Sequence, residues 1–162
     1  MSEGIGKIEI QGCDLEYQWL GPPPSAAAPT LVFLHEGLGC VQMWRNFPEQ
    51  LAGATGLGAL NYSRAGYGGS DPAILPRRTD YMHNEAQQVL PEVLDAFGIQ
   101  SAILVGHSDG GSISLIHAGS EVGARIKALI LLAPHVFVEL LSIANIREVA
   151  KLYCSTDLPA RL

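Results

Sequence analysis

Short, continuous runs of apolar residues alternate along this chain with stretches that have helical periodicity. Two such runs are residues 30–34 and 102–105, and residues 57–62 and 126–133 are further predicted strands that are each interrupted by one polar residue. Strands that are buried on both faces of a parallel sheet have this unbroken apolar character. Helices between successive strands form βαβ units, whose right-handed crossovers place helices on both faces of the sheet. The sequence therefore predicts an α/β fold with a mostly parallel sheet.

The remaining elements fit this arrangement and bring the expected sheet to about six strands. Residues 6–11 and 15–20 are extended-type stretches that predict an opening hairpin. Residues 80–97 carry one apolar stripe at three- and four-residue steps, which predicts a helix that Pro91 kinks or divides. Shorter helices are expected at residues 48–53, 110–120 and 143–153.

Composition restricts the classes of partner that the chain could bind. Only 16% of the residues are charged, against about 25% in average domains, and the formal net charge of −6 argues against a nucleic-acid surface. The three cysteines are scattered, which indicates neither a disulfide framework nor a metal site. Residues 1–10 lack the pattern of a signal peptide, and the longest apolar run, residues 128–134, is too short to cross a bilayer. We therefore expect a cytoplasmic protein that binds no metal, membrane or nucleic acid.

The strongest motif is Gly106-His107-Ser108-Asp109-Gly110, which follows a predicted strand and opens a predicted helix. A G-x-S-x-G elbow needs this context, because its serine occupies a strained turn at the end of the sheet. Glycines two positions away on either side leave room for that turn. The N-terminal N–H groups of the helix then favour developing negative charge, so the N–H of Asp109 is one candidate oxyanion donor. The alternative is a glycine-rich turn in which Ser108 only caps the helix.

A second glycine-rich turn, His35-Glu36-Gly37-Leu38-Gly39, follows the apolar run at residues 30–34. Ligands gather at the carboxyl ends of parallel strands, where both turns would meet. A flexible turn at this point could aim a second backbone N–H at the same oxyanion, although an ordinary turn would have the same sequence.

With these two turns and the glycine-rich loop at residues 63–71, the chain resembles the α/β-hydrolase superfamily. The resemblance covers about residues 6–135 and is closest to the branch with lidded serine esterases, lactonases and C–C hydrolases. It implies Ser108 as nucleophile, with the N–H groups of Gly37 and Asp109 as oxyanion donors. It also implies a core over residues 1–135 and the start of a helical lid over residues 136–162. The family usually has glycine where this chain has Glu36, which affects the first donor.

Serine at position 108 separates this chain from the related dehalogenases and epoxide hydrolases, which use aspartate there. Asp109 comes one position later and is expected to point elsewhere. An acyl-serine mechanism on a small ester, thioester or lactone is therefore favoured, and no cofactor is implied. A perhydrolase or C–C hydrolase could use the same nucleophile, and a non-catalytic domain that keeps the fold is the alternative of a different class.

The acid and histidine of the family's triad normally follow the lid, and the chain ends at Leu162. We therefore expect a C-terminally truncated fold and impaired activity. His135, just after the run at 126–133, is the best substitute base, with Glu139 as its acid. His35 and His107 are weaker candidates.

Three side chains, Trp44, Tyr67 and Val136, are candidates for a substrate pocket, although packing would explain them equally well. Without further strands, the run at residues 126–133 becomes an exposed sheet edge that favours self-association.

Overall fold

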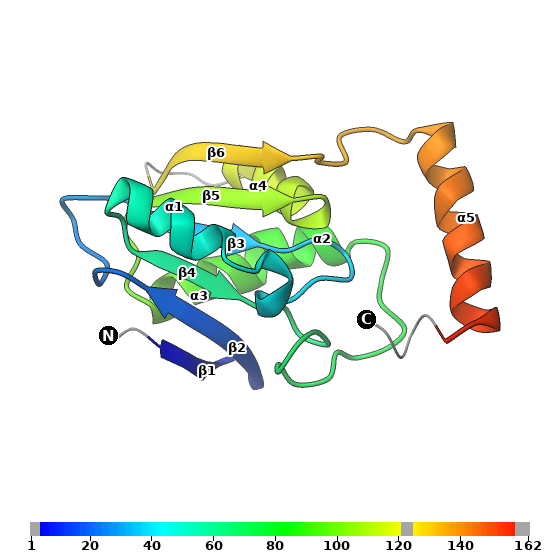
Figure 1. Ribbon diagram of the computed structural model, residues 1–162, viewed down its shortest axis with the longest axis horizontal. Helices are drawn as coiled ribbons and strands as arrows, with labels where there is room; N and C mark the ends of the chain where they lie inside the picture. Colours follow the sequence, from blue (N-terminus) through cyan, green and yellow to red (C-terminus); the bar gives the residue numbers. More distant parts are fainter. Residues whose placement is uncertain (1–3, 121–124, 158–162) are drawn as a thin grey trace.

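The computed structural model describes residues 4–120 and 125–157 of the chain. A six-stranded sheet in the order β1-β2-β4-β3-β5-β6 forms its centre (Figure 1). The strands are β1 (Gly4–Ile10), β2 (Cys13–Leu20), β3 (Thr30–Leu34), β4 (Ala59–Tyr62), β5 (Ala102–His107) and β6 (Ile126–Leu132). The helical elements are the 3-10 helix η1 (Val41–Trp44), α1 (Phe47–Thr55), α2 (Tyr81–Asn84), the π-helical turn η2 (Glu85–Val89), α3 (Leu90–Ala96), α4 (Asp109–Ser120) and α5 (Leu140–Ser155).

Parallel pairing dominates the sheet, as the apolar runs predicted. Strand β3 pairs in parallel with β4 and β5, and β5 pairs in parallel with β6. Strands β1 and β2 form the predicted antiparallel hairpin, and β2 continues antiparallel to β4. The carboxyl ends of β3, β4, β5 and β6 therefore lie at one edge of the sheet, where the loops that follow them gather.

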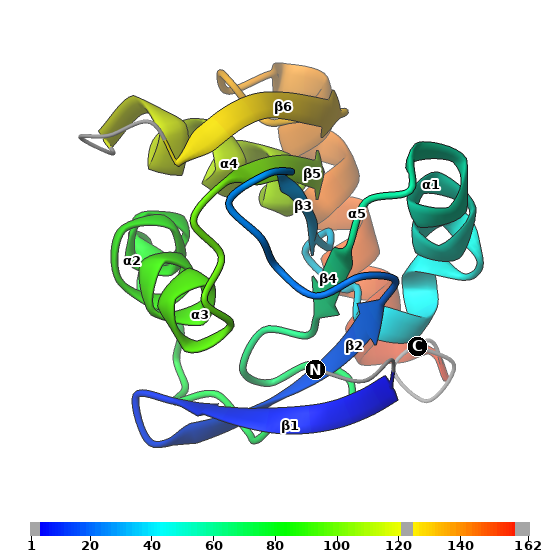
Figure 2. The same cartoon turned by 90° about the vertical axis from the view of Figure 1, so that its left-hand side faces the viewer.

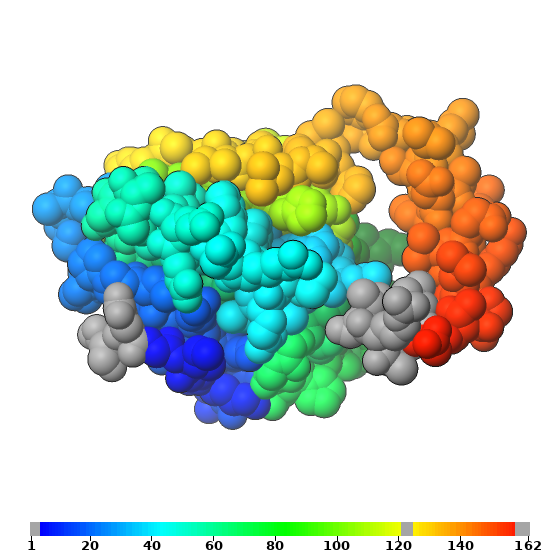
Figure 3. Space-filling model, viewed as in Figure 1, coloured from blue at the N-terminus to red at the C-terminus, as the bar shows by residue number. Residues whose placement is uncertain are grey.

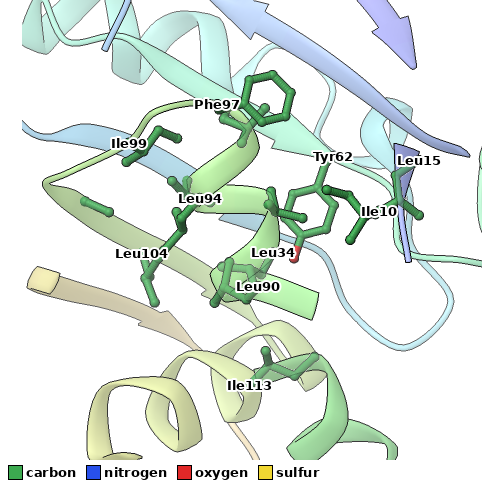
Figure 4. Close-up of a cluster of buried hydrophobic side chains, with 14 of the residues drawn as sticks. Ile10, Leu15, Leu34, Tyr62, Leu90, Leu94, Phe97, Ile99, Leu104 and Ile113 are labelled. Atoms are coloured by element: carbon green, nitrogen blue, oxygen red, sulfur yellow. The ribbon is translucent and has the colours of Figure 1, made fainter. Parts of the chain in front are cut away.

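Helices cover both faces of the sheet. Helix α1 lies on one face, whereas α2, α3 and α4 lie on the other (Figure 2). The larger buried cluster includes Leu104 of β5, Leu94 of α3 and Ile113 of α4 (Figure 4). The smaller cluster brings Phe33 of β3 against Ala52 of α1. The three-layer arrangement confirms the predicted α/β fold class.

The long helix expected over residues 80–97 runs without a break over residues 81–96, but its hydrogen-bond pattern changes in the middle. Its middle is the π-helical turn η2, which ends one residue before the helix that contains Pro91. Proline has no N–H to donate, and its ring collides with the carbonyl four residues earlier in a regular α-helix. A π-helical turn widens the backbone at this point, so that the apolar stripe continues into α3.

Strand β6 is an edge of the sheet within the described residues, as expected. Its outer side chains Ile130 and Leu132 are 38% and 40% exposed. Beyond it, residues 133–139 lead to α5, which stands off from the body of the molecule and has no buried residue (Figure 3). The lid role of residues 136–157 stays a prediction, and residues 158–162 of that expected segment lie outside the described residues. None of the described helices is both long and apolar enough to cross a membrane.

Candidate active site

Ser108 occupies the turn between β5 and α4 in a backbone conformation that side chains rarely adopt. Its φ angle is +52°, and holding a non-glycine residue in this left-handed region costs about 1–3 kcal/mol. Glycine is required on both sides of the turn. A Cβ atom at Gly106 would collide with the carbonyl of Gly110, and one at Gly110 would collide with the carbonyl of Leu34. The predicted strained turn is therefore present.

The Ser108 hydroxyl faces His135, which lies three residues beyond the end of β6. The distance from Ser108 Oγ to His135 Nε2 is 2.9 Å, which is within the range for a nucleophile and its base. The Ser112 hydroxyl bonds both backbone groups of His135. Its hydroxyl accepts a hydrogen bond from the His135 N–H and donates one to the His135 carbonyl, each at 2.9 Å. Ser108, just before α4, and Ser112, in the first turn of α4, therefore both contact His135.

The carboxylate nearest to this pair belongs to Asp109 rather than Glu139. Glu139 accepts a hydrogen bond of 3.1 Å from Ser142 at the start of α5, so the expected Ser108–His135–Glu139 arrangement is not formed in this structure. Asp109 Oδ1 lies 3.8 Å from His135 Nε2, and the Tyr81 hydroxyl donates a hydrogen bond to Asp109 Oδ2. The first turn of α4 directs the Asp109 side chain to Tyr81 of α2 and not to the nucleophile position, as expected, although its second oxygen also approaches His135. In the described part of the chain, no carboxylate binds the Nδ1 atom of His135.

The residues that carry the two predicted oxyanion donors, Gly37 and Asp109, are neighbours in the structure. Gly37 lies against the elbow, since a Cβ atom at this position would be 3.0 Å from Asp109 Oδ2. No acceptor binds the N–H of Gly37 or of Asp109 within residues 4–120 and 125–157. Both amides are therefore free of protein acceptors among the described residues, and their oxyanion roles stay predictions.

His35 is buried and structural. Its Nε2 accepts a 3.0 Å hydrogen bond from the Arg64 N–H, and its Nδ1 lies 2.7 Å from the Glu36 carbonyl oxygen. Burial, and next the positive charge of Arg64, lower the pKa of His35 to about 3. A neutral histidine with both nitrogens engaged cannot act as the base for Ser108.

His107 diverges from Ser108 as expected for neighbours on a tight turn. Its Nδ1 lies 3.4 Å from Glu36 Oε2, and its ring is 6.3 Å from that of Trp44. Both His35 and His107 thus contact Glu36 of the oxyanion turn. His135 is the histidine that contacts Ser108.

Of the three predicted pocket residues, only Val136 lies beside the serine–histidine pair. Val136 is 60% exposed and lines a groove of about 420 Å³ that His135 and Ser112 also border. Trp44 packs in the smaller apolar cluster. Tyr67 packs edge-to-face against His35, with ring centroids 5.1 Å apart.

Residues 29–148 match the alpha/beta hydrolase fold family. The chain belongs to this family. The similar solved structures are about twice as long. A serine hydrolase from the bacterium Cycloclasticus zankles has a TM-score of 0.70 at 22% identity, over 82% of this chain and 46% of that chain. A Vigna radiata epoxide hydrolase mutant has a TM-score of 0.67 at 21% identity, over 80% of this chain and 38% of that chain. An α/β-hydrolase enzyme from a Medee basin deep-sea metagenome library has a TM-score of 0.65 at 25% identity, over 78% of this chain and 43% of that chain.

Three residues of this α/β-hydrolase site were not predicted from the sequence. Ser112 lies one helical turn after Ser108, a spacing that could have suggested contact with the same partner. Tyr81 and Arg64 come from other elements, and only the folded structure shows what they contact. Within the described residues, no group of three or more His, Cys, Asp or Glu side chains is placed to hold a metal ion.

Proposed function

We propose that this α/β hydrolase cleaves small carboxylic esters, thioesters or lactones through an acyl-Ser108 intermediate. The observation that carries the proposal is the 2.9 Å contact between Ser108 Oγ and His135 Nε2 on a strained strand-to-helix turn. An isolated capping serine has no need of a histidine partner or of a strained backbone.

The mechanism follows from the positions of these groups. His135 Nε2 accepts the Ser108 proton as Oγ attacks the substrate carbonyl carbon, and a tetrahedral oxyanion forms. The N–H groups of Gly37 and Asp109 donate hydrogen bonds to this oxyanion. Collapse of the intermediate breaks the bond to the leaving group, which takes the proton from His135. Water, deprotonated by the same nitrogen, then attacks the acyl-Ser108 carbonyl. The bond from the acyl carbon to Oγ breaks, Oγ takes the proton back from His135, and the acid leaves.

Catalysis should be slow in this chain, since no described carboxylate orients His135 through Nδ1. Loss of the triad acid in serine hydrolases costs about 10⁴-fold in kcat, because the wrong histidine tautomer is then populated. Asp109 cannot replace this acid, as its carboxylate approaches the same nitrogen that faces Ser108. We therefore infer a working nucleophile with a poorly oriented base.

The test is hydrolysis of p-nitrophenyl butyrate, together with labelling of Ser108 by a fluorophosphonate read by intact mass. We expect Ser108→Ala to abolish both signals and His135→Asn to lower the rate by about 100-fold, within the range for a general base. Ser25→Ala, in the loop before β3, is the matched control and should leave both unchanged. Equal rates in the native chain and Ser108→Ala would refute the proposal and favour a non-catalytic domain.

A further inference from the structure

Arg64, two residues after the end of β4, is a buried cation that contacts backbone rather than a carboxylate. It is 1% exposed. Its Nη1 donates a 2.6 Å hydrogen bond to the carbonyl of His35, and its Nη2 donates a 2.9 Å hydrogen bond to the carbonyl of Glu36. No salt bridge to Arg64 occurs among the described residues. A buried charge is costly unless it is well hydrogen-bonded. Here Nη1 and Nη2 are directed at two successive carbonyls of one turn, while Nε has no partner among the described residues.

The tautomer of His35 follows from its contact with Arg64. A backbone N–H can only donate, so the 3.0 Å contact from the Arg64 N–H makes His35 Nε2 the acceptor. The proton of the neutral ring is then on Nδ1, which donates to the Glu36 carbonyl at 2.7 Å. The same carbonyl accepts a third hydrogen bond, of 3.2 Å, from the Gly39 N–H. Three donors from three residues therefore fix the direction of the Glu36 carbonyl.

A fixed carbonyl also fixes the amide on the other side of its peptide bond. The Glu36–Gly37 bond is trans, and in a planar trans peptide the N–H points opposite to the C=O. The Gly37 N–H is thus directed away from Arg64. Gly37 itself lies against the side chain of Asp109, the residue after Ser108, and we infer that its amide is presented on that side of the turn.

We propose that Arg64 is a positioning residue that orients the oxyanion donor of Gly37 through the Glu36 carbonyl. Glycine at position 37 has wide backbone freedom, and Arg64 together with His35 removes that freedom before a substrate arrives. The inference rests on the proposed function, in which the Gly37 N–H stabilises the oxyanion. It adds a residue that touches neither substrate nor nucleophile.

The first test needs no catalysis. Backbone ¹⁵N relaxation gives the order parameter of the Gly37 amide in the native chain, in Arg64→Met and in Arg78→Met. Arg78 is the matched control, because its side chain is 84% exposed and bonds only Asp80. We expect a Gly37 order parameter of about 0.85 in the native chain and the control. In Arg64→Met we expect an order parameter below about 0.6, as for a flexible backbone. An unchanged Gly37 value in folded Arg64→Met would overturn the proposal.

The second test separates positioning from a purely structural role. In ester hydrolysis, Arg64→Met should lower kcat by about 10- to 100-fold with less than about a twofold change in KM, because removing an oxyanion donor outright costs about 10²- to 10³-fold. Arg64→Lys keeps the charge on a single donor nitrogen, so its kcat should lie between those of the native chain and Arg64→Met. If Arg64→Met does not fold, the Lys variant decides the question by the same split. Equal effects on kcat and KM in the folded variants would refute positioning. Absence of Ser108-dependent activity in the native chain would refute the proposed function alone, since the relaxation result stands separately.

Discussion

Acidification should destabilise this protein through His35, which the fold holds neutral. The ring is fully buried, and both of its nitrogens are engaged by the backbone of Arg64 and Glu36. Burial and the nearby Arg64 charge lower its pKa from 6.5 to about 3. An unfolded chain places the same ring in water, where its pKa is ordinary.

The size and sign of the effect follow from these two pKa values. Between pH 6.5 and pH 3 the unfolded chain binds more protons at this site than the folded chain, so the free energy of unfolding decreases as the pH falls. From pH 7.5 to pH 4.5 the site alone should remove about 2.5 kcal/mol of stability. Other groups titrate as well. Burial raises the pKa of Glu85, which acts in the opposite direction.

Comparison with His35→Gln isolates the contribution of this one ring. The amide oxygen of glutamine can accept the Arg64 N–H hydrogen bond but does not titrate. Urea unfolding followed by tryptophan fluorescence at pH 7.5 and pH 4.5 gives the loss of stability in each protein. We expect the native chain to lose about 2.5 kcal/mol more than the variant, and His83→Gln, on the exposed side of α2, to behave as the native chain. Equal losses in the native chain and His35→Gln would refute the buried neutral state.

Three further substitutions test other parts of the structure. Gly110→Ala should destabilise the fold by at least about 3 kcal/mol in urea unfolding, because the added methyl group would collide with the backbone of β3. The control Gly53→Ala places its methyl group in open space and should be neutral or stabilising. Ser112→Ala removes both hydrogen bonds that hold the backbone of His135, so it should lower kcat in ester hydrolysis and cost about 1–3 kcal/mol of stability; an unchanged kcat would count against the anchor. Ile130→Lys on the edge strand β6 should reduce self-association in size-exclusion chromatography with light scattering, and a native chain that is already monomeric would contradict this expectation.

The fold could be predicted because its signals are local. Unbroken apolar runs indicated buried parallel strands, and the glycines around Ser108 indicated a turn with no room for side chains. The proximity of Ser108 and His135 could also be inferred, because the ends of adjacent parallel strands meet at one edge of the sheet. Their 2.9 Å contact agrees with this inference, while their catalytic roles stay predictions.

The remainder of the site depends on rotamers and helix placement that periodicity does not encode. Glu139 follows His135 closely in sequence, yet the extended chain after β6 carries it to the start of α5. Asp109 reaches Tyr81 across 28 residues. Trp44 follows the oxyanion turn, but aromatic character near a motif does not separate pocket lining from core packing.

The left-handed conformation of Ser108 implies a conflict between stability and activity. Glycine adopts a φ of +52° with little strain, so Ser108→Gly should raise the free energy of unfolding by about 1 kcal/mol while it removes the nucleophile. The folded state would gain from losing the side chain on which the proposed chemistry depends. Selection for stability alone would therefore favour replacement of this serine, and only a requirement for its hydroxyl would keep it there.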